Sequence, residues 1–319
     1  MKDEAVGGPA PGSRWYKAFG LTIASNVPLE ELTAIDAVEA PDVTIRYADL
    51  DRPLPAMEDG VVFDYADPLG VYMAWPGVAA FRVCGTDEIQ VQPYPDTPRG
   101  FLAFPILGPV MAWLLQKREL LVLHASAVEI DGRSVVLMGD KMAGKSTTAA
   151  AFVQTGYRLV TDDLLAINVT GGADGKPVMF PAFAQLKLTQ QSANAVPITG
   201  ATALPLVYEG FTKRQHRLPD LYAGTIGADH FFVLHRGGDQ PLIAPLASAA
   251  GFQALMRFSY SIRFGSAPYT DRERAEQFRN CVTLANRAQI GDLHIPADLA
   301  RLGETVDLVA RHVRKIADR

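Results

Sequence analysis

The stretch LMGDKMAGKSTTAA, residues 137–150, determines how the rest of the chain is interpreted. From Gly139 to Ser146 it fits the pattern G-x-x-x-x-G-K-[ST], with an apolar run before it and good helix formers after it. Glycines let backbone N–H groups converge on phosphate oxygens, and a helix that begins near Gly144 adds the positive end of its dipole. The stretch therefore predicts a nucleotide-binding phosphate loop between a strand and a helix.

Several positions of this loop have an expected role in binding. Lys145 reaches the β- and γ-phosphates, and Ser146 offers its hydroxyl to Mg²⁺. Lys141 either contacts phosphate or projects into solvent, and the sequence leaves both open. The expected cofactors are ATP and Mg²⁺, and the alternative is a strand–helix turn with an accidental Lys-Ser. The expected nucleotide contacts are Gly139, Asp140, Lys141, Met142, Ala143, Gly144, Lys145, Ser146 and Thr147.

The segment before the loop, LLVLHASAVEIDGRSVVLMG (120–139), predicts a β-hairpin. Two apolar runs flank Asp131-Gly132, and this dipeptide suits a type I′ turn, which needs positive φ at both central positions. The strand that leads into the phosphate loop is then antiparallel to its predecessor. A mixed sheet follows, in contrast to the mainly parallel sheets of many phosphate-loop proteins.

Two adjacent aspartates form the second group of candidate site residues. Asp162 and Asp163 lie in YRLVTDDLLAINV (157–169), which is predicted to be a strand beside the phosphate-loop strand. Their side chains would then point to opposite faces and have different roles. One carboxylate can hold Mg²⁺ and the other can accept a proton from an attacking hydroxyl. The alternative for the aspartates is a solvated acidic turn. His124, in the hairpin, is either a site residue or a core residue whose polar groups are satisfied.

Residues 123–167 resemble the catalytic core of the HPr kinase/phosphorylase family, which shares its phosphate-loop fold with phosphoenolpyruvate carboxykinases. The matching features are the His before the hairpin, the loop GDKMAGKS and the segment GYRLVTDD. The resemblance implies an α/β (α+β) fold with a mixed sheet. It implies that His124 and Lys145 are in the active site, that Asp163 is the proton acceptor, and that Asp162 supports it or, with Ser146, binds the metal.

The chain departs from that family after the aspartates. The family has a second motif, E-I-R-G-x-G, with a metal-binding Glu, but residues 178–193 read VMFPAFAQLKLTQQSA. PAFAQLKL and the stretch YKAFGLTIASNVPLEEL (16–32) resemble instead the HPr-kinase-like proteins of lasso-peptide gene clusters, which phosphorylate a serine of a precursor peptide. Phosphoryl transfer favours an additional cation. Lys187, Lys213 and Arg214 are therefore candidate phosphate or substrate contacts, although the run at 213–217 also fits a solvated loop.

The chain of 319 residues is long enough for two domains, and its net charge of −5 provides no general attraction to nucleic acid or to an anionic membrane. Residues 1–12 are predicted to be a flexible tail, residues 13–95 a small, mostly antiparallel β-rich domain, and residues 100–319 the catalytic domain. The apolar run 101–116 is short of the roughly 20 residues of a membrane span and contains prolines, so we expect a buried helix with an irregular start.

These observations predict a cytoplasmic, ATP- and Mg²⁺-dependent serine kinase. Its expected partner is a peptide or small protein, of the lasso-precursor type, with no nucleic acid and no membrane. A homo-oligomer is one expectation for its assembly. Three alternatives stay open: a kinase of the carrier protein HPr, a small-molecule kinase, and a non-catalytic protein that is gated by nucleotide.

Overall fold

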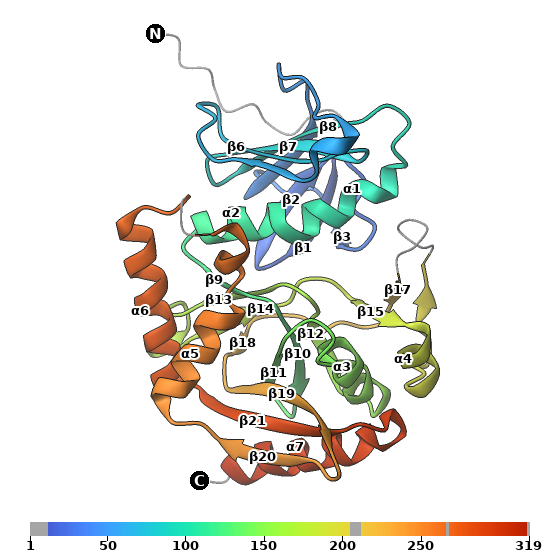
Figure 1. Cartoon of the computed structure of the whole chain (residues 1–319), viewed down its shortest axis with the longest axis vertical. Coiled ribbons are helices and arrows are strands. Elements are labelled where there is room, and N and C mark those ends of the chain that lie inside the picture. Colours follow the sequence, from blue (N-terminus) through green and yellow to red (C-terminus); the bar gives the residue numbers. More distant parts are fainter. Residues whose placement is uncertain (1–11, 205–211, 266–267, 318–319) are drawn as a thin grey trace. The chain divides into compact units, whose positions relative to one another are not determined.

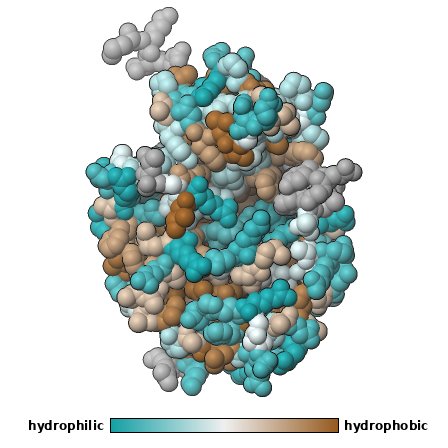
Figure 2. Space-filling view, viewed as in Figure 1, coloured by the Kyte–Doolittle hydropathy of each residue, from teal (hydrophilic) through white to brown (hydrophobic). Residues whose placement is uncertain are grey.

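The computed structural model of the chain describes residues 12–204, 212–265 and 268–317. It has a mixed α/β fold with several sheets, as expected, and divides into two compact units, Met1–Arg118 and Glu119–Arg319 (Figure 1). The expected tail, apart from Gly12, lies outside the described residues. Hydrophilic and hydrophobic residues are interspersed on the face drawn in Figure 2.

The first unit contains an eight-stranded sheet in the order β3-β1-β2-β4-β8-β7-β6-β5. Its pairs are antiparallel except β2–β4 and β4–β8, which are parallel. The domain is thus β-rich and mostly antiparallel, as its short alternating runs predicted. The strands are β1 (Arg14–Ala18), β2 (Leu21–Ser25), β3 (Thr33–Ile35), β4 (Val43–Tyr47), β5 (Val62–Asp64), β6 (Val71–Trp75), β7 (Ala79–Cys84) and β8 (Glu88–Pro93), with a short helical turn η1 (Met57–Asp59).

A long apolar helix ends this unit, made of α1 (Arg99–Pro105), η2 (Ile106–Val110) and α2 (Met111–Lys117). Gly108 leaves helical geometry at φ −113° and ψ −113°. Pro109 follows it, lacks the N–H that would bond back along the helix, and crowds the carbonyl four residues earlier. The irregularity therefore lies in the middle of the helix and not at its start.

By length and composition alone the helix Arg99–Lys117 could cross a membrane, but 61% of its most apolar window is buried, as in the core helix of a water-soluble protein. Trp113 packs on Tyr65 with ring centroids 5.2 Å apart, and the Arg118 guanidinium donates to the carbonyl oxygens of Asp42 and Thr86. These contacts group the helix with the first unit, although residues 100–319 were predicted to form the catalytic domain.

The second unit is built on a six-stranded sheet in the order β12-β10-β11-β19-β21-β20. The predicted hairpin is present: β10 and β11 are antiparallel, and Asp131 and Gly132 have φ of 50° and 81°. β11, β19 and β21 are parallel, so the sheet is mixed, as expected. Its strands are β10 (Ala125–Ile130), β11 (Arg133–Met138), β12 (Arg158–Thr161), β19 (His230–Gly238), β20 (Leu242–Pro245) and β21 (Gln289–Pro296).

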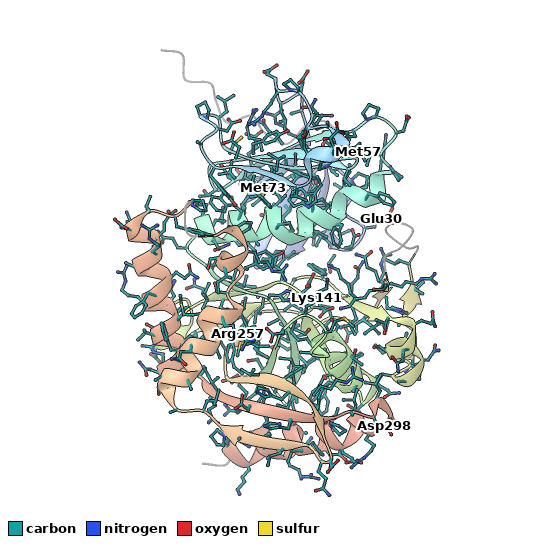
Figure 3. The ribbon with its side chains drawn as sticks, viewed as in Figure 1. Glu30, Met57, Met73, Lys141, Arg257 and Asp298 are labelled. Atoms are coloured by element: carbon teal, nitrogen blue, oxygen red, sulfur yellow. The ribbon has the colours of Figure 1, made fainter. Side chains whose placement is uncertain are left out.

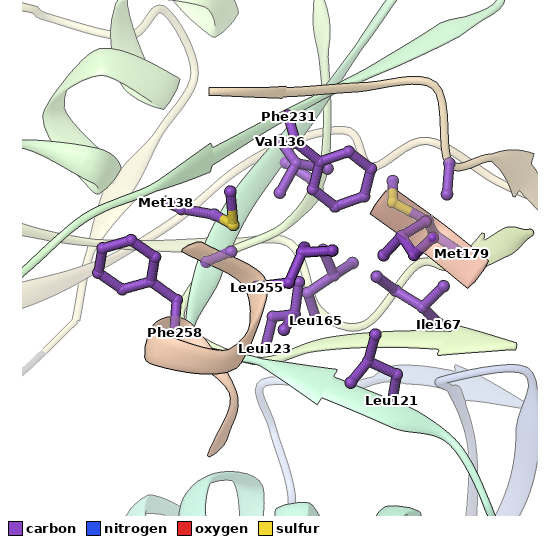
Figure 4. Close-up of a cluster of buried hydrophobic side chains, with 14 of the residues drawn as sticks. Leu121, Leu123, Val136, Met138, Leu165, Ile167, Met179, Phe231, Leu255 and Phe258 are labelled. Atoms are coloured by element: carbon purple, nitrogen blue, oxygen red, sulfur yellow. The ribbon is translucent and has the colours of Figure 1, made fainter. Parts of the chain in front are cut away.

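Helices cover both faces of this sheet. Val135 and Leu137 of β11 face a cluster that contains side chains of α3 (Lys145–Gln154) and α7 (Leu302–Ala317). Val136 and Met138 face a cluster that contains side chains of α5 (Ser248–Phe258) and α6 (Asp271–Arg287) (Figure 4). Full burial of each such aliphatic side chain contributes about 1.5–3 kcal/mol. β11 is therefore fixed from both sides, and so is the loop at its end.

Two smaller sheets complete the second unit. One has the order β18-β14-β13-β9, formed by β9 (Leu121–Leu123), β13 (Leu165–Asn168), β14 (Val178–Phe180) and β18 (Ile226–Gly227). The other has the order β15-β17-β16, formed by β15 (Gln185–Thr189), β16 (Thr202–Ala203) and β17 (Lys213–Arg217). The short helical segments are η3 (Ala173–Gly175), α4 (Gln190–Ala195), η4 (Tyr260–Phe264) and η5 (Leu299–Arg301).

Two sequence predictions for this unit were wrong. The segment 157–169 is not one strand: β12 ends at Thr161, β13 begins at Leu165, and the two belong to different sheets. β12 also pairs with β10 and not with the phosphate-loop strand β11. The aspartates thus lie in the bend between two strands, and this bend connects the six-stranded sheet to the four-stranded one.

Candidate active site

The phosphate loop connects β11 to α3, and its two glycines are required by its shape. Gly144 precedes α3 with φ of 99°, a left-handed conformation that residues with a Cβ rarely adopt. A Cβ on Gly139 would lie 2.8 Å from the Cβ of Ala143, closer than real Cβ contacts. The loop thus leads into the first turn of α3, whose N–H groups lack intrahelical partners, an arrangement that can bind an anion.

Lys145 is held inside this loop. Its side chain is buried, and its ammonium donates to the carbonyl oxygens of Gly139 at 2.8 Å and of Asp140 at 3.3 Å. Burial lowers the pKa of Lys145, although the carboxylates of Asp162 and Asp163 act in the opposite direction. The position suits an ammonium that exchanges loop carbonyls for phosphate oxygens when a nucleotide binds.

Ser146 and Asp162 form a hydroxyl–carboxylate pair next to the loop. The Ser146 hydroxyl donates to Oδ1 of Asp162 at 3.0 Å, and the Ser126 hydroxyl donates to the same oxygen at 2.5 Å. The backbone N–H of Lys187 donates to Oδ2 at 3.1 Å. Asp162 is fully buried, and burial together with the charge of Asp163 raises its pKa. Such hard oxygen donors fit Mg²⁺.

Asp163 does not share these hydroxyl partners and lies between two basic groups. Its Oδ1 is 3.1 Å from Nδ1 of His124, and its Oδ2 accepts a hydrogen bond from the Lys187 ammonium at 2.7 Å. Burial acts to raise the pKa of Asp163, but Lys187 and His124 outweigh it and hold that pKa well below its usual value. About a third of the Asp163 side chain, 34%, remains exposed, so an acceptor can reach it.

The side chains of Asp162 and Asp163 have different directions because the backbone bends at Asp163, and not because side chains alternate along a strand. Asp163 has φ of 74°, and Asp tolerates this left-handed region better than most residues. Thr161 stabilises the bend, since its hydroxyl donates to the carbonyl oxygen of Leu164 at 2.6 Å. The two carboxylates therefore contact different side chains: Asp162 contacts Ser126 and Ser146, and Asp163 contacts His124 and Lys187.

Residues of the η4 region surround His124. The backbone N–H of His124 donates to the carbonyl oxygen of Phe258, and its imidazole meets the buried Tyr260 ring edge-on, with centroids 6.4 Å apart. Burial raises the pKa of Tyr260 to about 12. The Arg263 guanidinium lies 4.8 Å from the centroid of the same ring. His124 is thus held by its backbone and by an aromatic neighbour while Nδ1 is directed at Asp163.

The other predicted site residues occupy the periphery. Lys141 is exposed on the phosphate loop (Figure 3). The Thr147 hydroxyl donates to that of Ser192 at 2.9 Å. Lys213 is close enough to Lys145 to contribute to lowering its pKa. Arg214 follows Lys213 on a strand, so the two side chains point to opposite faces.

Two residues of this region were not among the predicted site residues. Ser126 lies in the quoted hairpin stretch, but nothing marked it as a partner of Asp162 until the fold brought β10 next to the aspartates. Arg257, at the end of α5, pairs with Asp140 of the phosphate loop at 2.6 Å, and both side chains are exposed (Figure 3). Its distance of more than a hundred residues along the chain gave no signal for this contact.

Comparisons with known proteins find partial relatives among HPr kinase/phosphorylases. No protein-family model matches the chain. It is 40% identical over 52 residues to the HPr kinase/phosphorylase of Treponema pallidum, in each of two strains, which is 16% of each chain. It is 34% identical over 63 residues to the HPr kinase/phosphorylase of Lachnoclostridium phytofermentans, which is 19% of this chain and 20% of that one. The chain thus spans a fifth or less of these relatives.

A solved structure also aligns with the chain. The HPr(Ser) kinase/phosphatase from Coxiella burnetii matches with a TM-score of 0.32 and 14% identity, over 61% of this chain and 98% of that one.

Proposed function

We propose that the second unit is a phosphotransferase, which moves the γ-phosphoryl group of ATP to the hydroxyl of a serine in a peptide or small protein. The observation that carries the proposal is the position of Asp163. Its carboxylate is held by His124 and Lys187, remains partly exposed, and lies beside the Ser146–Asp162 pair and the phosphate loop. A module that only binds nucleotide would not need this second, separately held carboxylate.

The proposed reaction uses these groups in one step. The acceptor oxygen forms a bond to the γ-phosphorus while the bond to the β–γ bridging oxygen breaks, ADP leaves, and Asp163 takes the hydroxyl proton. A carboxylate with a low pKa is a weak base, but the loose transition state of phosphoryl transfer demands little basicity and much positioning. Lys145 and Lys187 supply the positive charge that developing phosphate oxygens need.

The residues present fit Mg²⁺. Ser146 and Asp162 offer a hydroxyl and a carboxylate side by side, and Mg²⁺ commonly takes one or two protein oxygens together with phosphate oxygens and water. When bound, the ion would neutralise charge on the β- and γ-phosphates. Asp162 would then ionise fully, because the cation offsets the burial that raises its pKa.

The identity of the acceptor is a separate step of the proposal. The resemblance of PAFAQLKL to the lasso-cluster kinases favours a ribosomal precursor peptide, and Lys187 of this segment contacts Asp163. The partial similarity to HPr kinase/phosphorylases supports HPr as the second candidate. We further propose that the protein acts in the cytoplasm, where ATP is supplied.

Mass spectrometry of a transfer reaction tests the proposal. The reaction contains the full chain, ATP, Mg²⁺ and the short peptides encoded beside its gene, with HPr in parallel. The expected result is phosphate on a peptide serine, abolished by Asp163→Asn and retained by Asp307→Asn on the exposed side of α7. Phosphate on HPr alone would identify HPr, and not a peptide, as the acceptor. No transfer to any peptide, to HPr or to small hydroxyl compounds would refute the proposal that the protein is a kinase.

A further inference from the structure

The basic run at 213–217 is a strand, and its register decides which of its side chains can serve the site. In the β15–β17 pair, Lys213 lies opposite Thr189 and Arg217 lies opposite Gln185. Lys187 lies opposite Gln215 between them. Residues that are directly opposite share a face, and alternate residues along a strand do so as well. Lys213, Lys187 and Arg217 therefore form a row on one face, which we call the cationic row.

On the opposite face of this sheet, the side chains of β15 pack into the core. Leu186 and Leu188 of β15 belong to the buried cluster that also contains residues of α3. Arg214 and His216 are opposite these leucines, so they share that face and not the face of the cationic row. Within this basic segment, Lys213 and Arg217 therefore share a face with Lys187, and Arg214 and His216 do not.

The cationic row is centred on Lys187, which contacts the candidate base Asp163, and extends to Lys213 on one side and Arg217 on the other. Lys187 contacts Asp163 at 2.7 Å, and Lys213 is near enough to Lys145 to affect its pKa. Diagonal neighbours on adjacent strands are about 7–8 Å apart, so Lys213 and Arg217 flank Lys187 at about that distance on either side. Lys213 and Arg217 are both partly exposed.

A buried amide lies at the Arg217 end of the cationic row. Gln185 is 2% exposed, and within the described residues neither its amide nitrogen nor its amide oxygen has a hydrogen-bond partner. It lies directly opposite Arg217, on the face of the cationic row. A buried amide without partners is unfavourable unless another group satisfies it. The face of the cationic row is therefore polar, not apolar, at its Arg217 end.

We propose that the cationic row binds acidic side chains that flank the acceptor serine, so that the protein prefers an acidic acceptor peptide. The inference rests on the proposed function and names its substrate class. Charge complementarity supports it: the chain has a net charge of −5, yet this face gathers cations beside the candidate base. A carboxylate on each side of the serine would meet Lys213 and Arg217 while the hydroxyl meets Asp163.

Peptide binding without turnover tests this inference separately from catalysis. A fluorescent peptide with Ala in place of Ser and Asp on both sides is compared, by anisotropy, with its Asn and Lys counterparts. The wild type should bind the Asp peptide about tenfold more tightly than the Asn peptide at low salt, and less selectively at high salt. K213Q/R217Q should lose most of this preference, and Arg214→Gln, on the other face, should keep it.

Charge reversal makes the test decisive. K213E/R217E should bind the Lys peptide in preference to the Asp peptide. Equal binding of the Asp and Asn peptides by the wild type, or equal losses in Arg214→Gln and K213Q/R217Q, would overturn the inference. Charge-selective binding without phosphate transfer would instead refute the kinase and leave the cationic row standing.

Discussion

The ammonium of Lys187 lies 2.7 Å from Oδ2 of Asp163, and this contact sets the charge state of the candidate base. The contact counters the burial of Asp163 and, with His124, keeps its pKa well below the usual value. Asp163 is therefore ionised throughout the physiological pH range. The same lysine donates its backbone N–H to Asp162, so one residue positions both carboxylates.

Removal of the Lys187 charge should change the pH profile. In Lys187→Met the anion of Asp163 loses its main stabiliser, so its pKa rises and the acid limb of kcat/KM moves to higher pH. We also expect a fall in kcat of about 10²-fold, because a cation near the transferred group is lost. The pH–rate profiles of wild type and variant measure both effects. Lys315→Met, exposed on α7, is the control, and an unmoved acid limb in Lys187→Met would contradict the assignment.

The Ser126 hydroxyl should matter for nucleotide binding. Ser126→Ala removes a buried hydrogen bond to Asp162, which favours the protonated carboxyl and weakens the candidate Mg²⁺ site. We expect a lower affinity for MgATP, with little change for ATP without metal, and a loss of about 1–3 kcal/mol in the free energy of unfolding. Calorimetric titration and denaturant unfolding provide these values. If Ser126→Ala binds MgATP as the wild type does, Asp162 is not the metal-facing carboxylate.

Two glycine substitutions distinguish an effect on the phosphate loop from an effect on the overall stability of the fold. Gly144→Ala places a side chain at φ of 99°, which costs about 1–2 kcal/mol and distorts the loop, so nucleotide binding should be lost. Gly303→Ala adds a Cβ with nothing within 4 Å near the start of α7, and should stabilise the fold by about 0.5–1 kcal/mol without changing binding. Nucleotide titration and thermal melts distinguish the two. Normal binding by Gly144→Ala would count against this loop as the nucleotide site.

Stability should fall in acid because of His230. This imidazole is 1% exposed, and its ring nitrogens have no hydrogen-bond partner within the described residues. Burial lowers its pKa from 6.5 to about 4. Because the folded pKa is depressed, the unfolded chain binds the proton first, and the free energy of unfolding decreases as pH falls from about 6.5 towards 4, by at most about 3 kcal/mol.

Replacement of this histidine isolates its contribution. His230→Phe removes the titrating group, so its free energy of unfolding should depend less on pH between about 6.5 and 4 than that of the wild type. Denaturant unfolding at several pH values measures the difference. Identical pH dependence in the two proteins would show that other groups cause the acid loss.

The local features of the site could be predicted because they depend on short stretches of sequence. Asp131-Gly132 determined the hairpin, and Gly144-Lys145-Ser146 determined the loop and the start of α3. The resemblance to HPr kinase/phosphorylases implied that Asp162 and Ser146 serve one metal, and the two side chains are hydrogen-bonded. In each case a few neighbouring residues carry the backbone geometry or the chemistry.

The features that the sequence did not predict depend on tertiary packing. β21 was missed because QIGDLHIP lacks a clear alternation, although the strand is held between β19 and β20. The bend at Asp163 requires a positive φ that Asp-Asp does not signal. The basic run was treated as one segment, and only its pairing with β15 separates Lys213 from Arg214.

The central claim is that an acceptor hydroxyl close to Asp163 attacks the γ-phosphorus of ATP. The most direct test is a reaction with ATP whose nonbridging γ-oxygens carry ¹⁸O, followed by mass spectrometry of the acceptor peptide. The account predicts a peptide phosphate that retains the nonbridging labels, bonded through the unlabelled serine oxygen, in wild type and not in Asp163→Asn. Labelled phosphate released to water with an unmodified acceptor, or undiminished transfer by Asp163→Asn, would contradict it.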